Sequence, residues 1–372
     1  MRKLDDGIIF SATDIVNFLE CEHLTSLDRI NLETPLERSP EDPTMRLIQE
    51  HGTRHEQQYL ASLHEGGRTI IDVSEKGAGL DHQVAATRQA LADGPEVVYQ
   101  AALRDGVFAG YADFLERVDH PSDLGSFSYE VVDTKLSKSP KAKYLVQLAF
   151  YSSILAKWQG RMPEAMHVVL GDGTRLTYRV ADYIRYYYTL QARFLEAQLR
   201  DPAATYPVPC AKCAQCSWSG LCEQVWERDD HLSRVANIRQ AQVNKLNAAG
   251  INTLQALANL GDGLHVPKLA SETLSVLRHQ AKLQWQERVT GKRVVDLLPA
   301  IEGDGRGFQR LPPPDEGDLY FDMEGDPLEK NGLEYLFGVG YRKPEGFVFV
   351  PFWGHNREQE KVAFEAFIDF VV

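Results

Sequence analysis

Long apolar segments are missing from this 372-residue sequence, and no run approaches the roughly 20 residues needed to cross a membrane. Residues 1–14 carry acidic side chains where a signal peptide would need an apolar core. Positive charge is also in deficit, because 40 Lys and Arg face 53 Asp and Glu, for a net charge of -13. General nucleic-acid binders are usually basic, so that class is disfavoured, whereas an enzyme with metal-binding carboxylates is not excluded. We expect a globular, cytoplasmic protein.

Cysteine is scarce, but the five cysteines are not scattered. One stands at position 21, and the others stand at positions 210, 213, 216 and 222. An odd number of cysteines without a secretion signal does not suggest a disulfide scaffold. The Cys-x2-Cys-x2-Cys spacing is typical of an iron–sulfur site, although four thiolates this close together can also hold zinc. The spacing therefore predicts a metal site at residues 210–222.

The chain is organised around residues 128–152. A short apolar strand at residues 129–132 ends in the triplet Asp133-Thr134-Lys135. Because strand side chains alternate between faces, Asp133 and Lys135 project from the same face. A carboxylate at this place can hold a cation, and a lysine can stand beside a water that attacks phosphorus. Taken alone, the triplet also fits a surface ion pair at the end of a strand.

A second carboxylate is expected one strand earlier. Two alternating runs joined at Asp105-Gly106 predict a β-hairpin, and Asp113 lies on its second arm. Carboxylates on adjacent strands can bind Mg²⁺ or Mn²⁺ through oxygen, and the backbone carbonyl of Thr134 is suited to contribute. The hairpin and the triplet together therefore predict one site with two acids.

The segment after the triplet adds polar and basic groups. A helix predicted over residues 142–158 carries Gln147 and Tyr151 one turn apart. Three lysines just after the triplet form a basic cluster and are candidate contacts for phosphates: Lys138, Lys141 and Lys143. A second basic cluster, much later in the chain, extends from Lys268 to Arg293.

Two helices are predicted before the hairpin. One spans residues 13–30 and carries Cys21, and the other spans about residues 44–63 and carries His51 and His55. A Pro-rich polar loop separates them, so we expect two independent helices at the start of the fold.

Residues 223–290 are predicted to be helical. Within them, residues 245–284 have the form of helix, glycine-containing turn, helix, with Gly250 at the turn. Backbone amides at such a turn can meet a phosphate. Plain helical packing between domains accounts for the same pattern, so both interpretations stay open.

After a Gly- and Pro-rich linker, the sequence opens a new strand that carries Asp322 and Glu324 on one face. A strand meander and a helix at residues 357–372 follow. Two acids on one strand face can bind a metal, but they also fit a strand-end pair without catalysis. We take the second interpretation for this chain.

Three motifs in this order resemble those of the RecB-like branch of the PD-(D/E)XK nucleases: Gly110-x-x-Asp113, Asp133-x-Lys135 and Gln147-x-x-x-Tyr151. In that branch an upstream helix supplies a histidine to the metal, and His55 matches by position, with His51 as a competitor. The chain has Asp133 where many relatives have Glu; both are oxygen donors.

The resemblance implies a role for each residue. Asp113 and Asp133 would bind the metal, with His55 and Thr134 as further ligands. Lys135 would activate or orient the attacking water. The residues that position the DNA backbone or the lysine would be Gln147 and Tyr151.

The cysteines resemble those of a subset of RecB-like nucleases that includes CRISPR-associated and AddB-type members. These proteins close a 4Fe-4S cluster with one cysteine before the nuclease core and three after it. The resemblance implies Cys21, Cys213, Cys216 and Cys222 as cluster ligands, with Cys210 surplus. The alternative is zinc, held by the four cysteines between positions 210 and 222 while Cys21 takes no part.

The strand that carries Asp322 and Glu324 looks like the first motif of the DEDD exonucleases, which have an RNase H-like fold. That family needs further acids from later elements, and the sequence ends at Val372. We therefore predict an incomplete second site in a partial RNase H-like domain.

The expected fold class is α/β, with a restriction-endonuclease-type core of a mixed central sheet flanked by helices. The expected domains are a nuclease at residues 1–230, a helix-hairpin-helix-like segment at 231–300, a linker at 301–317 and a partial RNase H-like domain at 318–372. The order of domains resembles one subgroup of RecB-like nucleases, some of which continue into a helicase.

The expected function is a Mg²⁺- or Mn²⁺-dependent deoxyribonuclease that acts on single-stranded DNA or on DNA ends, in repair, recombination or defence. A helicase is an expected partner, and no membrane is. Two alternatives stay open. One is a module that binds DNA for a helicase without cutting it, and the other is a zinc-stabilised RNA-processing nuclease.

Overall fold

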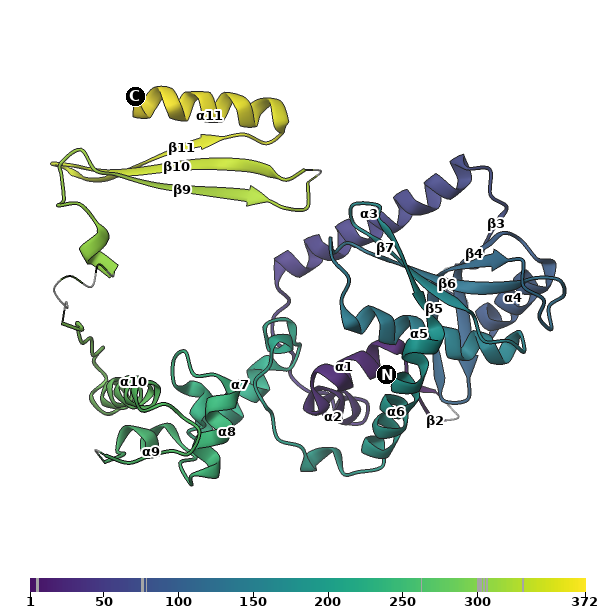
Figure 1. Ribbon diagram of the computed structural model, residues 1–372, viewed down its shortest axis with the longest axis horizontal. Helices are drawn as coiled ribbons and strands as arrows, with labels where there is room; N and C mark the ends of the chain where they lie inside the picture. Colours follow the sequence, from purple (N-terminus) through teal and green to yellow (C-terminus); the bar gives the residue numbers. More distant parts are fainter. Residues whose placement is uncertain are drawn as a thin grey trace. The chain divides into compact units, whose positions relative to one another are not determined.

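The computed structural model describes residues 1–4, 7–74, 77, 79–261, 263–299, 303, 305, 307–329 and 331–372. The chain divides into two compact units, Met1–Val294 and Val295–Val372, and each is described by itself (Figure 1). The domain boundary expected at residue 230 lies inside the first unit and stays a prediction.

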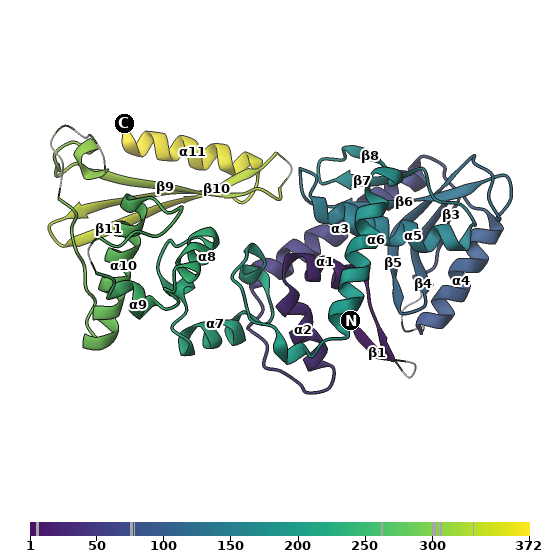
Figure 2. The same cartoon turned by 60° about the horizontal axis from the view of Figure 1, so that its bottom comes forward.

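The first unit is built around a mixed sheet of six strands: Ile70–Asp72 (β3), Val97–Asp105 (β4), Phe108–Val118 (β5), Ser128–Lys135 (β6), Ala165–Leu170 (β7) and Arg175–Arg179 (β8). They lie side by side in this order (Figures 1 and 2). The pairs β3–β4 and β6–β7 are parallel, and the other pairs are antiparallel. A parallel neighbour needs a crossover connection, and between β6 and β7 this is helix α5, Ala142–Trp158.

Helices cover both faces of this sheet, and the alternation of strand side chains decides which residues meet which helices. One face includes Val97, Phe114 and Val132, which pack against Tyr59 and Leu63. Tyr59 and Leu63 both belong to helix α3, Pro43–Glu65. The opposite face packs against α5 and three further helices: Ala12–Glu20 (α1), Leu80–Asp93 (α4) and Val180–Gln198 (α6).

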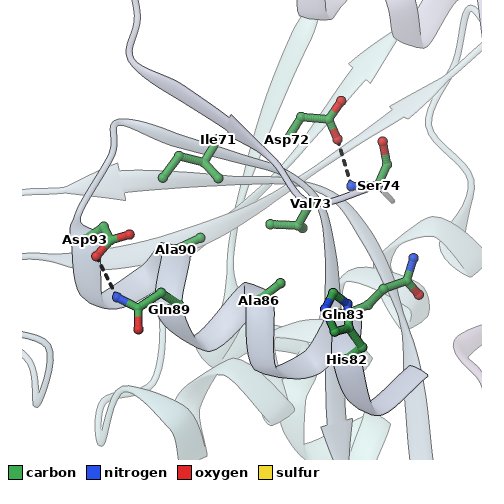
Figure 3. Close-up of a pocket in the computed structure, with 10 residues that line it drawn as sticks. All are labelled: Ile71, Asp72, Val73, Ser74, His82, Gln83, Ala86, Gln89, Ala90 and Asp93. Atoms are coloured by element: carbon green, nitrogen blue, oxygen red, sulfur yellow. Dashed lines mark hydrogen bonds between the residues drawn. The ribbon is translucent and has the colours of Figure 1, made fainter. Parts of the chain in front are cut away.

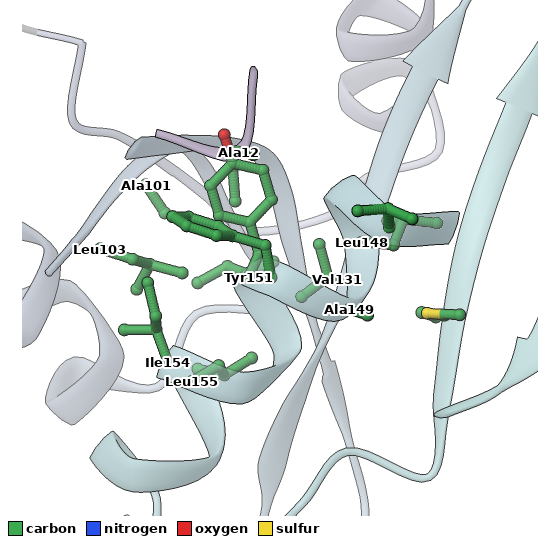
Figure 4. Close-up of a cluster of buried hydrophobic side chains, with 14 of the residues drawn as sticks. Ala12, Ala101, Leu103, Val131, Leu148, Ala149, Tyr151, Ile154 and Leu155 are labelled. Carbon is green, nitrogen blue, oxygen red and sulfur yellow. The ribbon is translucent and has the colours of Figure 1, made fainter. Parts of the chain in front are cut away.

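Helix α5 is buried nearly all round, which explains its almost continuous apolar sequence. Its residues Leu148, Ile154 and Leu155 pack with Leu103 and Val131 of the sheet (Figure 4). Helix α5 also contacts α1 and α6 on its other side. The helix that follows the Asp133 triplet is therefore the central element of the first unit's core.

The single helix predicted over residues 13–30 is wrong, because the chain breaks at Cys21. Helix α1 ends at Glu20, and α2 spans Glu22–Asn31. Cys21 stands between them in an extended conformation, with φ -162° and ψ 109°. The apolar periodicity continues across the break, so the pattern alone did not reveal it. Ahead of α1, the strands Arg2–Leu4 (β1) and Gly7–Ile9 (β2) form a two-stranded ribbon.

The last part of the first unit is helical, as predicted, but made of short elements. A separate apolar cluster there includes Leu246, Leu254 and Leu277. The α-helices described there are Ser219–Arg228 (α7), Gln240–Ala248 (α8), Leu254–Ala258 (α9) and Ser271–Thr290 (α10). Gly250, with φ +79°, lies in the turn between α8 and α9.

The second unit contains an antiparallel sheet of Leu319–Asp326 (β9), Leu333–Lys343 (β10) and Gly346–Trp353 (β11), with β10 in the middle. Helix α11, Arg357–Val371, lies along one face of this sheet (Figure 1). Phe367 of this helix contacts Phe321, Phe337 and Phe352. The predicted meander and final helix are confirmed in these residues.

The predicted mixed sheet flanked by helices is therefore confirmed, and the protein is an α/β protein. Within the described ranges, no helix combines the length and apolar character that crossing a membrane requires. The RecB-like and helix-hairpin-helix assignments remain predictions.

Candidate active site and cysteine cavity

Asp133 is the centre of the predicted site. It lies near the end of β6, and it is 1% exposed. Lys135 Nζ lies 2.5 Å from Asp133 Oδ2, so the predicted same-face pair forms an ion pair. Gln147 of α5 donates a hydrogen bond from Nε2 to Asp133 Oδ1 at 3.1 Å. Gln147 therefore holds one oxygen of this buried carboxylate through a hydrogen bond, whereas Lys135 holds the other through its charge and not through a hydrogen bond of good geometry.

Asp113 lies where the strand ladders on both sides of it become irregular. The ladder between β5 and β6 stops at Phe114 paired with Val132, and the Asp113 carboxylate then accepts the N–H of Thr134 at 3.0 Å. The Thr134 hydroxyl lies 3.3 Å from the same oxygen. On the other side, Gln100 interrupts the β4–β5 register with φ +55°. Left-handed backbone at a residue other than glycine costs energy and is concentrated at functional sites.

The charges at this site influence one another. Burial raises the pKa of Asp113 above its ordinary value, and the nearby Asp133 carboxylate raises that pKa further. Burial alone lowers the pKa of Lys135, but the Asp133 and Asp113 carboxylates outweigh burial and raise that pKa. Lys135 is therefore protonated and neutralises part of the negative charge. A bound divalent cation would take over that neutralisation and free the lysine for a ligand oxygen.

Tyr151 packs tightly against Gly110 on β5. A Cβ atom at position 110 would lie 3.0 Å from the Tyr151 hydroxyl oxygen and 3.1 Å from a ring carbon. Tyr151 is 5% exposed, and burial raises the pKa of its phenol. A larger residue at position 110 would require the ring to shift by a few tenths of an ångström, which gives Gly110 a steric reason.

Two residues of this site were missed from the sequence. Tyr144, in the first turn of α5, places its ring 5.6 Å from Lys135 Nζ, a cation–π contact. Glu56 of α3 accepts hydrogen bonds from the Tyr99 hydroxyl at 2.7 Å and from Gln100 Nε2 at 2.6 Å. Burial raises the pKa of Glu56, and the charge of Asp113 raises it further, so this third carboxylate belongs to the same electrostatic site.

His55 is the neighbour of Glu56 on α3, and that adjacency was the available signal for the missed acid. Nε2 of His55 lies 3.4 Å from the carbonyl oxygen of Val169 on β7. In register, Val169 is paired with Thr134, so the histidine lies beside the triplet. His51, the competing residue, lies one turn earlier on the same helix.

The three lysines after the triplet differ in their surroundings. Lys138 and Lys141 are exposed. Lys143 is half-buried and donates to Glu20 Oε1 at 3.1 Å. The first two are therefore open to a polyanion, whereas the third already has a carboxylate partner in this conformation.

All five cysteines line one cavity, although they come from distant parts of the chain. Cys210 Sγ and Cys213 Sγ are 3.8 Å apart. Most of the other lining residues are apolar, Leu24, Leu27 and Trp226 among them, and Lys212 and Ser219 also line the cavity. Cys210, which the cluster hypothesis left out, therefore lies beside the predicted ligands.

The sulfur atoms have polar as well as apolar neighbours. The backbone N–H of Trp218 donates to Cys216 Sγ at 3.4 Å, and that of Cys210 donates to Cys213 Sγ at 3.3 Å. Burial raises the pKa of Cys21 to about 11 and that of Cys222 to about 12. These thiols hold their protons at neutral pH, so a metal has to displace them on binding.

Among the described residues, no group of three or more His, Cys, Asp or Glu side chains is gathered closely enough to hold a metal ion as it stands. The cysteine cavity nevertheless fits such a group chemically, because five sulfur atoms and two backbone donors converge on it. Ligand binding there requires the side chains to draw together.

Asp322 and Glu324 lie on the face of β9 opposite to α11. Their strand is exposed along almost its whole length, and the hydrogen bond that Asp322 accepts comes from the neighbouring Met323 N–H at 3.0 Å. In register, Asp322 is paired with Gly338 and Glu324 with Leu336. Within the ranges that the structure describes, this pair has no ionic partner of the kind that Lys135 gives Asp133.

The Gly250 turn uses its own amides. The Gly250 N–H donates to Asn247 O at 3.0 Å, and the Ile251 N–H donates to Leu246 O at 3.0 Å, both closing α8. A phosphate would have to meet later amides of the turn. Lys268, the first residue of the second basic cluster, accepts a hydrogen bond at its backbone carbonyl from Lys245 Nζ of α8.

A hollow elsewhere on the first unit contains none of the predicted site residues. It lies between β3 and α4, and its lining residues include Ile71, Asp72, Val73, His82 and Ala90 (Figure 3). This hollow therefore lies apart from the predicted site.

A scan against protein-family models found no match, and a search of curated proteins found no similar sequence. The interpretation of the site therefore depends on its own geometry and on the motif resemblance.

Proposed function

We propose that this protein is a metal-dependent DNA nuclease whose reaction centre is Asp133. One observation carries the proposal: a buried acid is held between Lys135 at 2.5 Å and Gln147 at 3.1 Å, beside a second acid on the next strand. A purely structural ion pair does not need the second acid or the left-handed residue opposite it.

Asp113 and Asp133 would hold Mg²⁺ or Mn²⁺, with the backbone carbonyl of Thr134 as a further ligand. Carboxylate and carbonyl oxygens are the donors that these ions prefer. Glu56 and His55 approach from α3 and are candidates for a remaining position. When bound, the ion lowers the pKa of a water and stabilises charge on phosphate.

The side chains of the protein supply orientation and charge. Lys135 is protonated and donates hydrogen bonds, so it orients the attacking water or neutralises a phosphate oxygen. Gln147 fixes the Asp133 carboxylate. Tyr151 packs against Gly110 and keeps its proton, which makes the phenol a donor to the DNA backbone or a support for α5.

Lys138 and Lys141 are the proposed phosphate contacts, because both are exposed close to the triplet. The protein as a whole is acidic, so binding would depend on this local cluster. Single-stranded DNA or DNA ends are the proposed substrates, and a helicase is the proposed partner.

The cysteine cavity would hold a 4Fe-4S cluster through Cys21, Cys213, Cys216 and Cys222. The position of Cys210 inside the same cavity favours zinc as the alternative. Either group would join the N-terminal helices to the segment after α6 and stabilise the nuclease. The zinc form is the one expected of an RNA-processing protein.

The test is degradation of labelled single-stranded DNA and RNA by anaerobically purified protein, with and without Mg²⁺ or Mn²⁺. Metal-dependent degradation of DNA that disappears in Asp133→Ala and in Lys135→Ala supports the proposal. Degradation that survives both substitutions in clean protein contradicts the assignment. DNA binding without degradation favours the non-cleaving module, and brown protein absorbing near 400 nm favours the cluster over zinc.

A further inference from the structure

Glu20 lies between the cysteine cavity and the nuclease site. It is the last residue of α1 and immediately precedes Cys21. Its Oε1 accepts a hydrogen bond from Lys143 Nζ at 3.1 Å. Its Oε2 lies 4.0 Å from Lys212 Nζ, and Lys212 stands between Cys210 and Cys213 in the sequence. One carboxylate therefore connects a lysine of α5 to a lysine of the cysteine segment.

This bridge is more enclosed than an ordinary surface ion pair. The exposed fractions of the side chains are 27% for Glu20, 34% for Lys143 and 24% for Lys212. Oε2 of Glu20 is buried and makes no hydrogen bond to any residue that the structure describes. A buried carboxylate oxygen without a hydrogen bond is costly, so this atom is poised to gain a donor when its surroundings tighten.

The bridge reaches the reaction centre through α5. Lys143 and Gln147 are four residues apart and therefore lie on the same side of the helix. Gln147 in turn donates to Asp133. Cys21 is thus connected to Asp133 by the backbone to Glu20, the Glu20–Lys143 hydrogen bond, one turn of α5 and the Gln147–Asp133 hydrogen bond.

We propose that Glu20 is a positioning residue that couples occupancy of the cysteine cavity to the first turn of α5, and through it to Gln147 and Asp133. The proposal depends on metal binding by the cysteines. It deepens the proposed function, because it makes the metal at the cysteines a regulator of the nuclease site as well as a structural staple.

A simpler explanation is that apolar packing alone holds α1 against α5, and that the Glu20–Lys143 contact adds nothing to it. Ile15 and Phe18 of α1 belong to the same apolar cluster as Tyr144 and Leu148 of α5. That packing would hold the two helices together whatever the cysteines bind. The two explanations differ in whether α5 responds to removal of the metal.

The experiment is hydrogen exchange of the full chain, with residues 142–148 as the reporter. Wild-type protein, Glu20→Gln, Lys143→Gln and the double variant are purified anaerobically, and each is measured before and after chelation of the bound metal. Glu22→Gln is the matched control, because Glu22 also adjoins Cys21 but its carboxylate faces Arg200 at 3.6 Å. Iron and zinc content are measured in every sample.

In wild type and in Glu22→Gln, chelation should speed exchange in this segment about fivefold, the size expected from loss of one half-buried ion pair. In the other three variants, exchange should be fast before chelation and change little afterwards, without additivity in the double variant. The proposal is overturned if exchange of residues 142–148 in wild type does not change on chelation. It is also overturned if exchange in Glu20→Gln changes on chelation as much as in wild type.

This readout does not require DNA cleavage. Protein that shows the predicted exchange pattern but cleaves no nucleic acid would contradict the nuclease proposal and leave the coupling intact. Protein that cleaves DNA but shows no response to chelation would do the reverse. Failure of every variant to bind iron or zinc, wild type included, overturns the coupling.

Discussion

Strand β6 carries the pair Asp133-x-Lys135, and strand β9 carries the pair Asp322-x-Glu324. Both pairs begin with an acid and have the same spacing, but their surroundings differ. Asp133 is 1% exposed, and it contacts a lysine and a glutamine. A second acid, Asp113, lies on the adjacent strand. Asp322 and Glu324 lie on an exposed strand, and Asp322 accepts a hydrogen bond from its neighbour's backbone. Enclosure by chemically matched partners, more than the spacing of the acids, separates a candidate active site from an acid pair.

The largest expected difference is in catalysis. Asp133→Asn keeps the shape of the side chain but removes the charge that holds the cation, so the cleavage rate should fall by about 1000-fold or more. The double variant Asp322→Asn/Glu324→Gln should stay within about twofold of wild type, the scatter expected of a surface change. Initial rates on labelled single-stranded DNA at saturating Mn²⁺ measure both. Equal losses in the two variants would remove the distinction between the sites.

Loss of the metal at the cysteines should affect the first unit alone, because all five cysteines precede residue 223. Cys216→Ser should lose the bound metal and lower the Tm of the first unit by about 10 °C, the shift expected for a few kcal/mol in a domain of this size. Scanning calorimetry under anaerobic conditions measures the change. A second unit whose melting moves by the same amount would contradict the assignment of the metal to the first unit.

The same cysteines distinguish the two cofactors. An iron–sulfur cluster requires Cys21 and tolerates Cys210→Ser, whereas zinc requires Cys210 and tolerates Cys21→Ser. Metal analysis of the two variants, together with absorbance near 400 nm, gives opposite results for the two hypotheses.

A smaller difference is expected at two crowded glycines. A Cβ at Gly110 would lie 3.0 Å from the buried Tyr151, and a Cβ at Gly338 would lie 2.9 Å from the ring of Phe349, which is 57% exposed. Gly110→Ala should cost about 2 kcal/mol of unfolding free energy, because the ring has no free space. Gly338→Ala should cost less than about 1 kcal/mol, because an exposed ring can turn away. Urea unfolding of both variants tests the ranking, and the reverse order would contradict it.

The smallest expected effect is on DNA affinity. Lys138→Ala should weaken binding of single-stranded DNA about threefold and reduce the salt dependence by roughly one phosphate contact. Lys343→Ala, on the strand next to Asp322, is the matched control and should change neither. Fluorescence anisotropy at several salt concentrations measures both quantities. A larger loss in the control would place the DNA contact in the second unit.

Local patterns predicted much of the first unit. The hairpin at Asp105-Gly106, the strand ending in Lys135 and the helix of residues 142–158 all appear close to their expected limits. These elements succeeded because period-two alternation, a turn dipeptide and a long apolar segment are each encoded within a few residues.

The features that were not predicted depend on residues distant in sequence. The extended conformation of Cys21 interrupts a helical pattern, and the pattern itself continues on both sides. Glu56 of helix α3 was missed because its partners, Tyr99 and Gln100, lie on β4, more than 40 residues later in the sequence. The left-handed conformation of Gln100 has no sequence signal of its own. The inclusion of Cys210 in the cavity likewise follows from tertiary packing.

The placement of the metal at Asp133 is tested most directly by the number of tight Mn²⁺ sites, counted by electron paramagnetic resonance of free Mn²⁺ in the full chain. We expect Asp133→Asn to lose a tight site that wild type has, and Asp322→Asn/Glu324→Gln to retain it. An Asp133→Asn protein that binds Mn²⁺ as wild type does, beside a second-unit variant that does not, would contradict the placement of the chemistry at Asp133.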